Sequence, residues 1–104
     1  MTALREYERL ESSGLWRANA DAQRRDVIVN FGNATLVITD GAGRPLTHWS
    51  LAAITRCNPG KLPAVFGPSI DDDETLELDD ETMINAIEKV GKSITKTRPK
   101  PGKL

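Results

Sequence analysis

Histidine, cysteine and aromatic residues are scarce in this chain of 104 residues, which has one histidine, one cysteine and 5% aromatic residues. The single cysteine, Cys57, excludes an intrachain disulfide and favours a reducing compartment. A histidine-based metal cluster, or a Ser/His or Cys/His catalytic pair, would depend on His48 alone. We therefore interpret His48 as an ordinary strand residue and Cys57 as a small buried hydrophobic residue.

Long apolar runs are also absent. No segment approaches the roughly 20 apolar residues that a transmembrane helix needs. The first residues, MTALREYERLE, lack the apolar stretch of a secretory signal peptide. These features predict a soluble, cytoplasmic domain.

The formal net charge is only −1, so the whole chain offers no electrostatic reason to bind nucleic acid. The charges are nevertheless unevenly distributed. Residues 71–88 hold nine acidic residues and no basic one, whereas residues 89–104 hold six basic residues and no acidic one. Matching of a helix dipole accounts for the bases up to Lys96, because cations stabilise the C-terminal end of a helix. It does not account for Arg98, Lys100 and Lys103, which lie further on.

Seven short strand-like runs precede one helical segment. Each run is rich in β-branched or apolar residues and is bounded by turn-forming residues. We expect strands at residues 15–18, 26–31, 35–39, 46–51, 54–57, 64–66 and 75–78. An amphipathic helix is predicted at residues 80–96, where apolar residues recur at steps of three and four, and residues 79–81 supply its capping oxygens.

Three local features refine this pattern. Residues 2–11 have the spacing of about two helical turns. Gly32 and Asn33 tolerate positive φ and are expected to form the turn of a hairpin. Residues 63–67 are flanked by prolines, which suits an edge strand.

This order of elements resembles the pleckstrin-homology-like (PH-like) superfold. The resemblance covers residues 14–96 and implies an α+β fold, a PH-like barrel or sandwich of about seven antiparallel strands capped by a C-terminal helix. The domain would then lie between an N-terminal helical segment, residues 1–13, and a basic Pro-rich tail, residues 97–104. Two features depart from the family. The closing helix has no tryptophan, and Arg17, Arg24 and Arg25 do not have the spacing of a phosphoinositide site.

The pattern YERLESSGLWRA…RRDVIVNFG is also similar to the N-terminal part of uncharacterised alphaproteobacterial membrane-anchored proteins. That resemblance implies a bacterial protein in which a PH-like domain precedes a transmembrane segment. The tail RPKPGKL would then be a juxtamembrane linker.

Two charged segments are candidate contact surfaces. The basic residues of the tail region are expected to meet an anionic membrane or partner; they are Lys96, Arg98, Lys100 and Lys103. The acidic loop is expected to dock a basic partner; it comprises Asp71, Asp72, Asp73 and Glu74. The segment that starts at Asp71 does not match an EF-hand loop, which needs Gly at its sixth position and a carboxylate at its twelfth. Those positions hold Leu76 and Thr82. A looser divalent site at residues 71–73 remains an alternative.

Other motifs have structural interpretations. Gly41 and Gly43 match part of a nucleotide-binding fingerprint, but no helix opens there, and we interpret the segment as a turn. Trp16 and Trp49 are expected in the core or at the barrel end, with an exposed peptide groove as the alternative.

No convergent set of titratable groups suggests an enzyme, and no cofactor is implied. We expect a binding or scaffolding module at the cytoplasmic face of the membrane, with a protein or peptide partner. The alternative is a nucleic-acid accessory module using Arg24, Arg25 and the tail, although aromatic residues are absent from that tail. Exposed edges between residues 54 and 66 would also allow homo-oligomers by strand addition.

Overall fold

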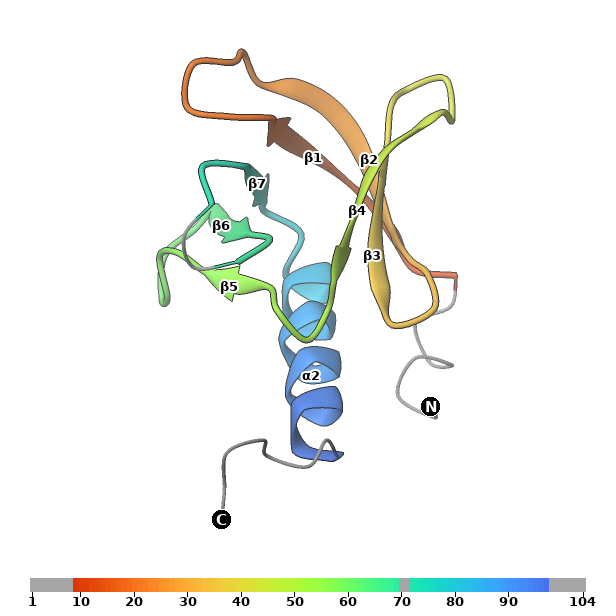
Figure 1. Cartoon of the computed structure of the whole chain (residues 1–104), viewed down its shortest axis with the longest axis vertical. Helices are drawn as coiled ribbons and strands as arrows, with labels where there is room; N and C mark the ends of the chain where they lie inside the picture. Colours follow the sequence, from red (N-terminus) through yellow and green to blue (C-terminus); the bar gives the residue numbers. More distant parts are fainter. Residues whose placement is uncertain (1–8, 70–71, 98–104) are drawn as a thin grey trace.

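A computed structural model of the chain describes residues 9–69 and 72–97, with side chains described up to residue 92. Seven strands are followed by one helix (Figure 1). The elements are β1 (Glu11–Arg17), β2 (Arg25–Phe31), β3 (Thr35–Thr39), β4 (Pro45–Ser50), β5 (Thr55–Arg56), β6 (Ala64–Gly67), β7 (Thr75–Leu78) and α2 (Glu81–Thr97). The predicted strands and helix are confirmed in number and order, with ends that differ by a few residues.

The strands form one antiparallel sheet in the order β4-β3-β2-β1-β7-β6-β5. The sheet curls into a half-barrel (Figure 1), which leaves β4 and β5 as its two edges. Curling brings β1 close to β7. At Gly14, an added Cβ would lie 2.7 Å from Leu78 Cδ2 and 3.0 Å from the Glu77 carbonyl oxygen, so a larger residue there would require Leu78 or the β7 backbone to shift.

Alternate residues of the strands point into the half-barrel and form its core. Val27 and Val29 of β2 face inward, as do Leu36 and Ile38 of β3, and all four are buried. The other buried apolar residues are Trp49, Leu51, Ala64, Phe66, Leu76, Leu78, Met83, Ile84, Ala86, Ile87 and Val90. The inward face of the sheet therefore packs against one stripe of α2.

Helix α2 begins where the sequence supplies a cap. Asp80 Oδ1 accepts hydrogen bonds from the backbone N–H groups of Thr82 at 2.9 Å and Met83 at 3.2 Å. Glu81 adds negative charge to the first turn. The helix then packs closely on the segment after β4, where a Cβ on Gly91 would lie 3.2 Å from the Leu51 carbonyl oxygen. No helix in the described ranges is long and apolar enough to cross a bilayer.

Three local expectations were wrong. Strand β1 begins at Glu11, so the sheet includes residues 11–13, which the sequence placed in a helical segment; there, Glu11 is the partner of Asn30. In the β2–β3 turn the positive φ of 60° belongs to Ala34 rather than to the Gly-Asn pair.

The third error concerns strand β6, which is not an edge strand. It lies between β7 and β5, while Pro63 and Pro68 flank Ala64–Gly67 without entering it. Prolines outside a strand do not remove any of its ladder hydrogen bonds, so their presence does not specify an edge.

Candidate functional site

Two tryptophans converge on one carboxylate inside the half-barrel. Trp16 Nε1 donates to Glu74 Oε2 at 2.8 Å, and Trp49 Nε1 donates to the same oxygen at 3.0 Å. Trp49 is buried and Trp16 is partly buried against the core, as the core interpretation predicted. The contact connects β1 and β4 to the residue that precedes β7, so it has a structural role in holding the curl of the sheet.

The acidic loop therefore contains two kinds of acidic residue. Glu74 is partly buried and hydrogen-bonded to the indoles, while Asp72 and Asp73 are exposed. Asp72 Oδ1 accepts a hydrogen bond from the Glu74 backbone N–H at 3.0 Å. Asp71 lies outside the described residues. Within the described residues, Asp72 and Asp73 are therefore the carboxylates of this loop that a basic partner could reach.

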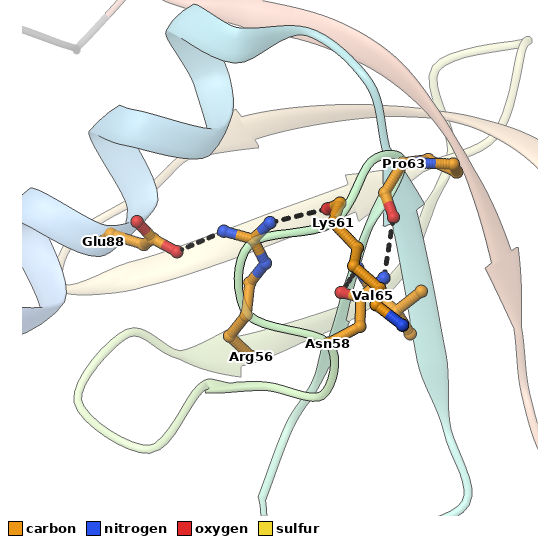
Figure 2. A network of polar contacts seen from close by, with 6 residues as sticks. All are labelled: Arg56, Asn58, Lys61, Pro63, Val65 and Glu88. Carbon is orange, nitrogen blue, oxygen red and sulfur yellow. Dashed lines mark hydrogen bonds and ion pairs between the residues drawn. The ribbon is translucent and has the colours of Figure 1, made fainter.

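A second polar network joins β5 to the helix (Figure 2). Arg56 Nη1 lies 2.6 Å from Glu88 Oε2, and Arg56 Nη2 donates to the Lys61 carbonyl oxygen at 2.8 Å. The guanidinium carbon lies 5.7 Å from the centroid of the Phe66 ring. Because Arg56 is on the inward face, its charge is held between the helix, the next loop and an aromatic ring.

The same network braces the loop of residues 57–63. Asn58 Nδ2 donates to the Pro63 carbonyl oxygen at 2.9 Å, and Asn58 Oδ1 accepts from the Val65 N–H at 2.8 Å (Figure 2). The Lys61 N–H also donates to the Asn58 carbonyl oxygen at 3.1 Å. Asn58, at the start of the loop, thus closes it through two side-chain hydrogen bonds to its far side, a role that Asn often has in turns.

The braced loop presents an apolar side chain. Leu62 is 59% exposed, and it is the one exposed large hydrophobic residue in the described part of the chain. Its neighbour Lys61 is also exposed. The sequence alone did not single out Leu62, since nothing in the local pattern distinguishes an exposed leucine from a buried one.

His48 lies on the outer face of β4, where it lines an open depression of about 510 Å³. None of the residues that line the depression is acidic, and none is lysine or arginine. They are Gly32, Asn33, Thr35, Val37, Pro45, Leu46, Thr47 and His48. Among the residues that the structure describes, no other titratable side chain lines this depression with His48.

Cys57 is exposed, so the expectation of a buried cysteine was wrong. It follows the inward-facing Arg56 in the sheet, and alternation along a strand directs the next side chain outward.

Of the basic residues predicted to contact a partner, one already forms an ion pair within the domain. Arg24 Nε lies 3.1 Å from Glu77 Oε2, while Arg25 is exposed. Arg98, Lys100 and Lys103 lie outside the described residues, as does the side chain of Lys96. Within the described residues, Arg24 is therefore less available to a nucleic-acid phosphate than the sequence suggested.

Asp40 organises the turn between β3 and β4. Its Oδ1 accepts from the N–H groups of Ala42 and Arg44, each at 2.9 Å, and its Oδ2 lies 3.1 Å from Arg44 Nε. The hydrogen bond from the Arg44 backbone is the largest cause that holds the pKa of Asp40 below its ordinary value of 3.8; burial opposes this shift, while the Ala42 N–H and the Arg44 charge add to it.

Across the described residues, no group of three or more His, Cys, Asp or Glu side chains is arranged to hold a metal ion. No family model matches this chain, and comparison with curated proteins finds no match.

Proposed function

We propose that this domain is a non-enzymatic binding module that recognises a protein or peptide partner through the loop of residues 57–63. The observation that carries the proposal is the combination of an exposed Leu62 with a braced backbone. Burying a leucine side chain contributes about 1.5–3 kcal/mol. Because hydrogen bonds already hold the loop, little conformational entropy is lost when a partner covers it.

The use of the ionic groups supports binding over catalysis. Glu74, Arg56 and Glu88 take part in contacts that join elements of the fold. Catalytic sites instead direct such groups toward a shared cavity. The strand order and the helix that packs against the inward face of the sheet are also compatible with the PH-like superfold, whose resemblance implies a role in recognition.

A place at the cytoplasmic face of the membrane is part of the proposal. Arg98, Lys100 and Lys103 would each gain about 1 kcal/mol near an anionic leaflet. Their sum is too small to anchor the domain at physiological salt, so the tail would orient a domain held nearby by its partner.

The test of partner recognition begins with selection of peptides that bind the purified domain from a displayed random library. Calorimetry then compares wild type with Leu62→Ser and with Glu11→Ser, an exposed change on β1. We expect Leu62→Ser to weaken binding about tenfold or more while thermal stability is unchanged, and Glu11→Ser to bind as wild type. Peptides that bind Leu62→Ser as tightly as wild type would refute the loop as the site.

Flotation with liposomes of rising anionic lipid content tests the membrane placement. Wild type is compared with a chain that lacks residues 97–104 and with Leu62→Ser. Flotation that needs both the anionic lipid and the tail supports the placement. Loss of flotation in Leu62→Ser would instead identify the loop as a lipid-inserting element, and absence of flotation in every chain would remove the membrane from the proposal.

A further inference from the structure

The exposed Leu62 lies close to the segment that joins β7 to α2. In the antiparallel β6–β7 ladder, Ala64 is the partner of Leu78. The chain that enters β6 through Leu62 and Pro63 is therefore at the same end of the ladder as the chain that leaves β7 at Asp79 and continues into α2. A partner that covers the exposed leucine must also meet the side chains at the start of the helix.

These side chains are acidic. Asp79, Asp80 and Glu81 are consecutive, and all three are exposed. Asp80 accepts hydrogen bonds from the first N–H groups of the helix. Within residues 9–69 and 72–97, neither Asp79 nor Glu81 forms an ion pair. These two carboxylates are therefore available to a partner.

The local charge beside Leu62 is negative. Lys61 contributes one positive charge, and the start of α2 adds about half of one, whereas the three carboxylates contribute three negative charges. Arg56 and Glu88, which meet from β5 and α2, neutralise each other across 2.6 Å. A cation is therefore attracted to this side of the loop, and an anion is repelled.

We infer that the partner segment that covers Leu62 carries a basic side chain next to its apolar one. The inference rests on the proposed function, because it takes Leu62 as the point of contact. The apolar contact supplies most of the affinity, and a lysine or arginine of the partner pairs with Asp79 or Glu81 at its edge. Exposed pairs of this kind contribute little each, but they raise the rate of association and reject acidic segments.

The same charges favour a peptide over a lipid surface as the occupant of this loop. An anionic leaflet attracts basic residues and repels carboxylates. Insertion of Leu62 into such a leaflet would bring the three acidic residues of the helix start toward it. The loop and the basic tail of residues 97–104 are thus assigned to different contacts.

Peptides selected on the whole chain from a displayed random library are the probe. Those that lose binding to Leu62→Ser are kept, and we expect lysine or arginine within two positions of their apolar residue. Calorimetry at about 50 mM salt then compares each peptide with a version in which these basic residues are replaced by glutamine. The replacement should weaken binding to the wild-type chain about fivefold.

A double-mutant cycle identifies the carboxylates. The chain with Asp79→Asn and Glu81→Gln should bind the basic peptides about fivefold more weakly than wild type, and it should no longer distinguish them from the glutamine versions. The control chain carries Asp21→Asn and Asp73→Asn, which remove the same charge from exposed positions on the side where β7 begins. The control should bind both peptides as wild type does.

The outcomes separate this inference from the proposed function. Binding that needs Leu62 but not Asp79 and Glu81 overturns the inference alone. An equal loss in the control chain also overturns it, because the attraction would then be unspecific. A library without peptides that need Leu62 overturns the proposed function and this inference with it. Flotation with anionic liposomes that needs Leu62 overturns the assignment of the loop to a peptide.

Discussion

Trp49 donates to Glu74 across 3.0 Å and so ties the edge strand β4 to the residue that precedes β7, although the two residues are 25 positions apart. Trp16 donates to the same oxygen from β1. One carboxylate therefore connects both sides of the curled sheet. The acidic loop contributes to stability at Glu74, while its exposed residues remain free to meet solvent or a partner.

Glu74→Ala should lower the free energy of unfolding by about 1–3 kcal/mol, because two partly buried indole N–H groups lose their acceptor. Glu74→Gln keeps an acceptor oxygen and should cost less. Urea unfolding measures both changes, and tryptophan fluorescence should report the altered surroundings of the indoles. Asp73→Asn is the control, since Asp73 is exposed. Equal stability of Glu74→Ala and Asp73→Asn would show that the indole contacts contribute nothing.

Arg56 and Glu88 should be unequal partners. Glu88→Gln removes an ion pair whose acidic side chain is 38% exposed. We expect it to lower the free energy of unfolding by about 1 kcal/mol. Arg56→Gln should cost about 2–3 kcal/mol, because it also loses the hydrogen bond to Lys61 and the contact with Phe66. A double-mutant cycle by chemical unfolding separates the pair from these other contacts. Losses of the same size for both single variants would contradict this account.

Ala34→Gly should stabilise the protein by about 0.5–1 kcal/mol. Ala34 has a φ of 60°, where a Cβ is strained and glycine is not. The greater freedom of glycine in the unfolded chain offsets part of the gain. Ala18→Gly, in an exposed bend, is the control, and we expect it to be neutral or slightly destabilising. Thermal unfolding compares the two variants, and a lower Tm for Ala34→Gly would refute the strain.

Asp40 should contribute to stability in a pH-dependent way. Its pKa is lowered in the folded state, so its stabilisation is fully present above the unfolded value near 3.8 and is lost as the pH falls through the folded pKa. The free energy of unfolding, measured between about pH 2 and pH 7, should therefore fall more steeply on acidification in wild type than in Asp40→Asn. NMR titration of the Asp40 carboxyl carbon checks the assignment. An unchanged acid dependence in Asp40→Asn would show that other carboxyls are responsible.

Much of the fold is predictable from the sequence because the relevant signals are local. The strands ending at Phe31 and Thr39 follow from β-branched runs bounded by turn residues, and α2 follows from its apolar period and from the cap at Asp80. The errors occurred where local signals compete. Gly14, a residue type that usually marks a turn, lies inside β1, where its lack of a side chain accommodates the close approach of Leu78.

The candidate site was less predictable. The two side-chain hydrogen bonds from Asn58 to the other side of the loop depend on the pairing of β5 with β6. The exposure of Leu62 depends on which residues cover the loop, and hydrophobicity alone does not determine that.

The sequence by itself determined the number and order of the elements and the polarity of the helix, since these depend on neighbours within a few residues. Only the tertiary structure decided that Trp16 would meet Glu74, 58 positions away, and that Arg56 would meet Glu88, 32 positions away. Such contacts follow from the curl of the sheet and from the packing of α2 against it. That geometry depends on the packing of all the strands together, so no local segment specifies it.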